Sequence, residues 1–219
     1  MPKDAIALWW WVRHGPAAAR PGEILGRLDP PVDLARLRGG VEALAPRLPA
    51  RAAWITSGAR RCLETARALA AARGQAPEMV TEPDLLEQDF GAWQGLTHAE
   101  AAARDADAAA RFWRDPAREP PPGGESFQAM LTRIAAAIGR IAERHPSGDL
   151  VLIAHAGTIR AALAQALDLP ADAALRFAVD PLSLTRLDRF AGEASGAPAA
   201  WRVAAVNVPA HGTGLSSES

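Results

Sequence analysis

The sequence predicts an α/β fold, a three-layer sandwich in which helices cover both faces of a mostly parallel sheet, with a small lid insertion. The apolar runs 5–12 and 150–154 each end in a tight turn, which is typical of strands buried on both faces. Segments with helical spacing of apolar residues alternate with the strand-like runs, and this alternation favours crossovers between parallel strands. The proline- and glycine-rich stretch 95–125 interrupts the alternation and is the predicted lid or cap.

The first half of the chain predicts three strands and two helices. The run 5–12 is the first strand, and a loop rich in turn residues follows it to about Asp33. Leucine and valine at helical spacing predict a helix over 34–48. Residues 53–56 form a short strand, Ser57 is the expected N-cap of a helix over 60–72, and residues 79–80 form an edge strand.

The second half predicts three helices and three strands. An alanine-rich helix is expected over 97–113, and Gly123 to Ser126 open an amphipathic helix with apolar residues from Phe127 to Ile141, to which we assign no chemistry. Strand 150–154 is followed by a helix over 158–167, and alternation predicts edge strands at 183–187 and 201–206. We read one domain over 1–207 and expect the tail 208–219 to be disordered.

The composition limits the possible partners. The chain has 219 residues, 49% of them hydrophobic and 22% charged, and a formal net charge of -1, so bulk charge gives no support for nucleic-acid binding. Cys62 is the only cysteine, which excludes an intramolecular disulfide and fits the reducing cytoplasm. No apolar run approaches the roughly 20 residues of a membrane helix, and Asp4 and Arg13-His14 disturb the signal-peptide pattern at the start.

Two strand ends carry the residues expected to do chemistry. Arg13-His14-Gly15 follows the first strand, and His155-Ala156-Gly157 lies between strand 150–154 and its helix. The carboxyl ends of such strands are where α/β sheets place their ligands. An arginine fork matches phosphate geometry, a neutral imidazole is a nucleophile, and the backbone at a helix start binds anions. Each string alone is a weak motif, but together they predict one phosphate pocket.

Further segments make the sequence resemble the histidine phosphatase superfamily, which includes the cofactor-dependent phosphoglycerate mutases. The resemblance covers nearly the whole chain and rests on the two histidine turns together with the segments Ser57-Gly58-Ala59-Arg60-Arg61-Cys62-Leu63-Glu64-Thr65-Ala66, Leu85-Leu86-Glu87 and Gly91-Ala92-Trp93. The α-ribazole phosphatase branch is the most similar, through Gly26-Arg27-Leu28-Asp29, Pro121-Pro122-Gly123-Gly124-Glu125-Ser126 and Asp89-Phe90-Gly91.

The resemblance implies a role for each site residue. His14 is the expected nucleophile, Glu87 the general acid and His155 a further catalytic residue, while Arg13, Arg61 and the backbone of Ala156 bind the phosphate. The sequence leaves open whether Asp89 replaces Glu87 and whether Arg60 competes with Arg61. Pro16 and Ala156 depart from the pattern of the family; Cys62 is read as a small buried hydrophobe, and His98 and His145 as solvated.

The expected function is a phosphomonoesterase that hydrolyses a small phosphate ester through a phosphohistidine intermediate, with α-ribazole 5'-phosphate as a candidate substrate. A phosphoglycerate mutase-type transferase and a broad-specificity sugar phosphatase stay open, as does a phosphate-binding regulatory module without turnover. No metal and no cofactor are expected, because no histidines have ligand spacing. The expected partner is a small phosphate ester, and a homodimer stays open.

Overall fold

A computed structural model describes residues 6–192 and 199–211. Six strands form one sheet in the order β3-β2-β4-β1-β5-β6. The strands are β1 (Ile6–Arg13), β2 (Ala53–Thr56), β3 (Met79–Thr81), β4 (Gly148–Ala154), β5 (Leu184–Phe190) and β6 (Ala200–Val208). Strands β1 to β4 run parallel, whereas β5 is antiparallel to β1 and β6 is antiparallel to β5.

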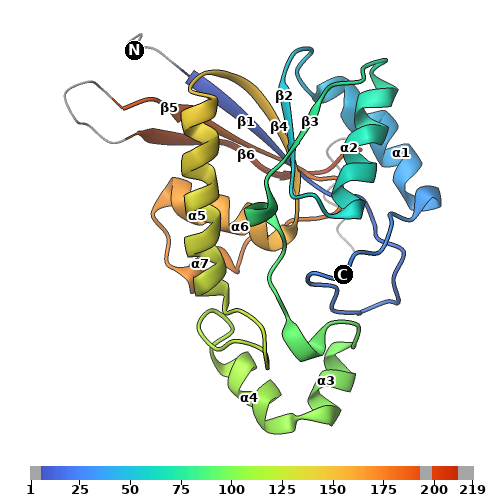
Figure 1. Cartoon of the computed structure of the whole chain (residues 1–219), viewed down its shortest axis with the longest axis vertical. Helices are drawn as coiled ribbons and strands as arrows, with labels where there is room; N and C mark the ends of the chain where they lie inside the picture. The colour runs from blue at the N-terminus through green and yellow to red at the C-terminus, as the bar shows by residue number, and fades with distance from the viewer. Residues whose placement is uncertain (1–5, 193–198, 212–219) are drawn as a thin grey trace.

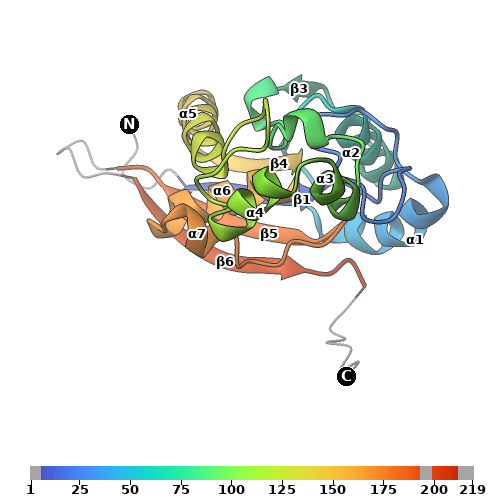
Figure 2. The same cartoon turned by 90° about the horizontal axis from the view of Figure 1, so that it is seen from below.

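Helices cover both faces of this sheet, which confirms the predicted three-layer α/β fold (Figure 1, Figure 2). They are α1 (Leu34–Leu44), α2 (Arg60–Ala72), α3 (His98–Arg104), α4 (Ala106–Arg114), α5 (Phe127–Arg144), α6 (Ala156–Leu167) and α7 (Ala171–Ala174). Helices α1 and α2 pack on one face, and α5, α6 and α7 pack on the other. Both faces of β1 and β4 are therefore buried, which explains their continuous apolar sequences.

Alternation along β1 divides its side chains between the two cores. Trp9 and Trp11 are fully buried on the face covered by α5 and α6, with ring centroids 5.9 Å apart. Val12 and the half-buried Trp10 lie on the opposite face, and the Trp10 indole N–H donates to Asp149 at 2.7 Å. The strand thus anchors the segment that follows it on both sides.

Two predicted elements differ from the structure. The strand expected at 183–187 is not an edge strand: β5 lies between β1 and β6, and β6 forms that edge of the sheet. The single helix expected over 97–113 is two helices, because Asp105 leaves helical geometry and its side chain accepts from the Ala108 N–H at the start of α4. Propensity favours one helix, but the cap at Asp105 and the packing of both helices favour the break.

The segment 95–125, here called the cap, projects beyond the carboxyl ends of the parallel strands (Figure 1). A small core, here called the cap core, joins the cap to the rest of the chain: Phe112 packs on Trp93, just before the cap, with ring centroids 5.1 Å apart, and Ile24 comes from the first loop. The cap therefore lies over the sheet edge where the histidines were predicted.

At the other end of the chain, β6 continues through Val208, within the expected tail, and residues 212–219 lie outside the described residues.

Candidate active site

The parallel pairing of β1, β4 and β2 brings three turns to one sheet edge. Arg13 pairs with Ala154 in the register of β1 and β4, and the His14 N–H donates to the Ala154 carbonyl at 2.9 Å. Ser57 directly follows β2, the strand on the other side of β4. The rings of His14 and His155 consequently lie 5.1 Å apart, centroid to centroid, with an interplanar angle of 67°.

His14 is held as a neutral imidazole with a defined tautomer. Its Nδ1 lies 2.7 Å from the Gly15 carbonyl oxygen, which can only accept, so Nδ1 carries the proton. The lone pair is then on Nε2, to which Arg61 Nε donates at 3.2 Å. Burial first, and then the positive charge of Arg61, lower the pKa of His14 to about 3. A neutral imidazole with a free lone pair has the chemistry of a nucleophile.

Arg61 lies between the two histidines and is 1% exposed. Its Nη1 donates to the Leu28 carbonyl at 2.6 Å and its Nη2 donates to the Gly26 carbonyl at 2.8 Å. The segment 26–29, noted in the sequence only as a branch feature, thus holds the guanidinium in place. Arg60 is exposed and pairs with Glu64 at 2.7 Å, so the structure brings Arg61 to the site and leaves Arg60 outside it.

His155 lies behind Arg61 and is completely buried. Its Nδ1 accepts from Arg61 Nη2 at 3.1 Å, so its Nε2–H donates to Ser57 Oγ at 2.9 Å. Burial, the neighbouring His14 and the charge of Arg61 hold the pKa of His155 well below its usual value. The expected N-cap role of Ser57 is wrong: α2 has Ala59 at its N-cap with no side-chain hydrogen bond, and Ser57 instead orients His155.

A cavity of about 340 Å³ opens in front of His14. Arg13, Arg61 and Arg160 supply three guanidinium groups to its wall, and Glu23 and Glu87 supply carboxylates. Arg13 Nη1 donates to the Val179 carbonyl at 2.6 Å, which fixes its fork beside His14. Three cations around a neutral nucleophile suit a phosphate dianion.

Glu87 reaches this cavity from the loop after β3. Its Oε2 accepts from the Gly157 N–H at 3.3 Å, and its Oε1 accepts from the Gln88 N–H at 3.0 Å. A side chain at position 157 would collide with the Glu87 carboxylate, which explains the glycine there. Asp89 turns elsewhere, since its Oδ1 accepts from the Gly91 N–H at 2.8 Å.

Ala156 is the first residue of α6, and its backbone is helical. Alanine in place of the glycine common in the family therefore causes no strain at this position. It does not contribute to the wall of the cavity in front of His14. Phosphate binding by its backbone stays a prediction.

The loop that carries Glu87 is held by Arg133, which the sequence analysis did not single out, and by Glu125, which it named only within the segment 121–126. Arg133 of α5 donates through Nη1 to the Asp84 and Leu86 carbonyls, at 2.7 and 3.1 Å. Its Nη2 donates to Glu125 Oε1 at 2.5 Å, and Glu125 also accepts from the Asp89 N–H at 3.1 Å. The backbone before and after Glu87 is therefore hydrogen-bonded to Arg133 of α5 and to Glu125, its partner. The sequence predicts only a core role for this helix.

We expect Arg133→Met to act through Glu87. The variant should lose about tenfold in kcat/KM on an alkyl phosphate and clearly less on p-nitrophenyl phosphate, because a displaced general acid matters only for a poor leaving group. Arg140→Met is the matched control, since Arg140 lies on the same helix but pairs with the side chains of Glu82 and Asp84. Equal losses on both substrates would show that Arg133 only supports the fold.

The two buried histidines predict acid-sensitive stability. Their pKa values are lowered in the folded protein, so between pH 6.5 and 5 the unfolded chain binds protons that the folded chain does not. Their contribution to stability is complete above pH 6.5 and falls by up to about 1.4 kcal/mol per pH unit for each histidine as the pH drops. Urea unfolding across this range measures the slope. His14→Asn, which keeps a donor for the Gly15 carbonyl, should make it clearly shallower; an unchanged slope would contradict the assignment.

The fold and the two histidine turns at one sheet edge are those of a known family. The chain belongs to the histidine phosphatase superfamily (branch 1), whose family model matches residues 9–197. The predicted family is thereby confirmed.

Relatives in this family carry different functional names. The chain is 35% identical over 158 residues to a bifunctional protein of Mycobacterium tuberculosis, covering 72% of this chain but 40% of that protein. It is 36% identical to a glucosyl-3-phosphoglycerate phosphatase of Mycolicibacterium vanbaalenii over 74% of each chain. It is 29% identical to the adenosylcobalamin/alpha-ribazole phosphatase of Escherichia coli, over 58% of this chain and 61% of that one.

The solved structures agree on the fold. The native structure of a mycobacterial glucosyl-3-phosphoglycerate phosphatase superposes with a TM-score of 0.78 at 27% identity, covering 92% of this chain and 99% of that one. Within residues 6–192 and 199–211, no helix is long and apolar enough to cross a membrane. The same described residues contain no group of three or more His, Cys, Asp or Glu arranged to hold a metal ion, and metal independence stays a prediction.

Arg160 and His98 line the cavity in front of His14, and the sequence analysis predicted neither of them as a site residue. Arg160 lies one helical turn after Ala156 on α6, a spacing that could have indicated the same helix face. His98 was expected to be solvated without a role, and it is exposed, but it also lines the cavity in front of His14. Only the position of the cap brings it there, and no local signal indicates that position.

Proposed function

We propose that this chain hydrolyses a small phosphate monoester through a phosphohistidine intermediate on His14. The observation that carries the proposal is the state of His14: a neutral ring whose Nδ1–H is tied to a carbonyl and whose Nε2 lies beside Arg61 at a cavity with three arginines and Glu87. A phosphate-binding regulatory module needs the arginines but not a buried, oriented nucleophile opposite a carboxyl group.

The proposed reaction has two steps. In the first, His14 Nε2 forms a bond to phosphorus, the bond from phosphorus to the ester oxygen breaks, and protonated Glu87 gives its proton to the leaving alkoxide. In the second, the Glu87 carboxylate takes a proton from water, the water oxygen attacks phosphorus, and the N–P bond breaks to release phosphate and neutral His14. Arg13, Arg61 and Arg160 balance the charge on the equatorial oxygens in both steps.

The substrate is proposed at two levels. The coarser proposal, a small phosphate ester, rests on the site itself. The finer one, α-ribazole 5'-phosphate, is supported by the segments 26–29 and 121–126 and by the similarity to the Escherichia coli phosphatase. Glucosyl-3-phosphoglycerate is the competing substrate, supported by the more similar Mycolicibacterium vanbaalenii relative. Mutase-type transfer would use the same residues with a second hydroxyl as acceptor in place of water.

We expect hydrolysis of p-nitrophenyl phosphate that persists in EDTA and is inhibited by vanadate, a mimic of the five-coordinate phosphoryl group. Release of inorganic phosphate is the measurement, and its yield per alcohol formed distinguishes hydrolysis from transfer to an added alcohol. Loss of activity in EDTA, restored by a divalent cation, would overturn the metal-free mechanism. Phosphate binding without any release would instead support the regulatory module.

A further inference from the structure

A second cavity, of about 370 Å³, adjoins the phosphate pocket on the side of Glu87. The two cavities share Glu87, Phe90, His98 and Arg160 in their walls, so they lie side by side. Because Glu87 is the proposed donor to the leaving oxygen, the second cavity lies where the leaving group must go.

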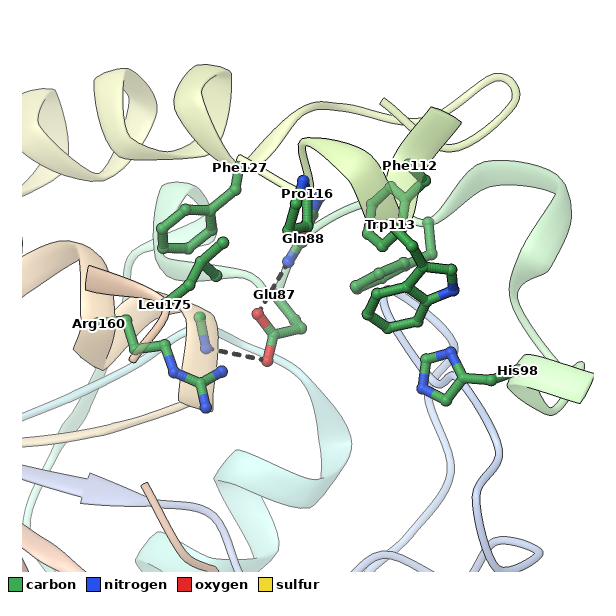
Figure 3. A pocket seen from close by; sticks show the side chains of 11 residues that line it. Glu87, Gln88, His98, Phe112, Trp113, Pro116, Phe127, Arg160 and Leu175 are labelled. Carbon is green, nitrogen blue, oxygen red and sulfur yellow. Dashed lines mark hydrogen bonds between the residues drawn. The ribbon is translucent and has the colours of Figure 1, made fainter. Parts of the chain in front are cut away.

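The walls of this cavity are aromatic and come from separate parts of the chain. Phe112 and Trp113 belong to α4 in the cap, Phe127 begins α5, and Leu175 follows α7. In Figure 3, Trp113 and His98 lie on one side of Glu87, and Phe127 and Leu175 lie on the other. A slot between two apolar walls fits a flat group.

Trp113 is the unusual member of this wall. It is 56% exposed, whereas its neighbour Phe112 is 6% exposed and belongs to the cap core. The Trp113 ring stacks edge-on with Phe112, centroids 5.2 Å apart, and with His98 at 5.3 Å. An exposed indole held in place by two rings is a preformed surface on which another ring can stack.

The charged residues of this cavity lie at its inner end, the end that adjoins the phosphate pocket. Among the described lining residues, Glu87 and Arg160 carry the formal charges, and Arg160 Nε donates to the Phe177 carbonyl at 2.9 Å. Burial lowers the pKa of Arg160, and the negative charge of Glu87 partly offsets this lowering. A carboxylate on the ligand would have to lie beside Glu87, which disfavours it. The far walls offer no cation, so the group that fills them should be uncharged.

We infer that the leaving group ends in an uncharged aromatic ring, bound between Trp113 on one wall and Phe127 and Leu175 on the other. The substrate class is then a phosphate monoester of an alcohol that bears such a ring, as in arylalkyl or nucleoside-like phosphates. The inference rests on the proposed phosphatase function and narrows its substrate.

The test compares 2-phenylethyl phosphate with ethyl phosphate, whose leaving alkoxides are chemically alike. Burial of one phenyl ring should raise kcat/KM for the aromatic ester roughly tenfold or more, mainly through KM. Trp113→Ala should lower kcat/KM for the aromatic ester about fivefold more than for ethyl phosphate. Arg114→Ala is the matched control, an exposed neighbour on α4 outside the cavity, and should leave the preference unchanged.

The outcomes separate the two proposals. If neither ester nor p-nitrophenyl phosphate is hydrolysed, the phosphatase function itself fails. If both esters are hydrolysed with equal kcat/KM, or if Trp113→Ala and Arg114→Ala leave the same preference, the aromatic subsite is refuted while the phosphatase stands. A carboxylated ester such as O-phosphoserine with a higher kcat/KM than 2-phenylethyl phosphate would also refute it, and would assign the inner end of the cavity, at Arg160, to carboxylate binding.

Discussion

His14→Ala is expected to lower kcat/KM on every phosphate ester by about 10⁴-fold or more, while the fold is retained. His14 is 6% exposed, and its ring makes its hydrogen bonds with Gly15 and Arg61, so its loss removes the proposed nucleophile without opening the apolar core. The measurement is steady-state hydrolysis of p-nitrophenyl phosphate, with circular dichroism to verify folding.

The covalent intermediate gives an independent test of the same residue. Rapid acid-free quenching of the wild-type protein with a labelled phosphate ester should trap a phosphoenzyme that is acid-labile and alkali-stable, as an N–P bond is. His14→Ala should trap none. Near-normal turnover in this variant would exclude His14 as the nucleophile. A phosphoenzyme that survives acid would point to a serine or threonine instead.

Glu87→Gln is the second large effect, and it should depend on the leaving group. Hydrolysis of an alkyl phosphate should fall by about 10²- to 10³-fold, because the alkoxide leaves only with a proton. Hydrolysis of p-nitrophenyl phosphate should fall by less than about tenfold, because p-nitrophenolate leaves without one. Both substrates are measured at one pH.

Asp89→Asn is the matched control for Glu87→Gln. The structure places the Asp89 carboxylate on the Gly91 N–H, away from the cavity wall that Glu87 reaches. Its replacement should therefore affect the two substrates equally. A loss of hydrolysis in Asp89→Asn that depends on the leaving group would identify Asp89 as the general acid. Equal losses on both substrates in Glu87→Gln would mean that Glu87 has a binding or structural role.

Local sequence was sufficient wherever one segment carries its own signal. Strand β2 and helix α2 have the bounds expected from the sequence, and β1 lies within one residue of its expected bounds. Apolar runs that end in a turn can be recognised without knowing what packs on them. The two histidine turns were found for the same reason, as each directly follows such a run.

Other features depended on packing between distant segments. The internal place of β5 depends on which strand pairs with β1, and the break between α3 and α4 depends on the small core that each helix joins. Arg133 lies on a helix whose apolar pattern is explained by the core, so periodicity alone gave no sign of its role beside Glu87.

The sequence by itself determined the fold class, the family and the candidate residues at the strand ends, because these depend on short-range periodicity and contiguous motifs. Only the tertiary structure decided that Arg61 lies between the two histidines, that Ser57 orients His155, and that Glu87 rather than Asp89 faces the cavity. It also decided that the aromatic residues of the cap form one wall of the adjoining cavity. Each of these is a contact between segments far apart in the chain. The local sequence of one segment does not specify which distant segment packs against it, because that depends on the tertiary fold.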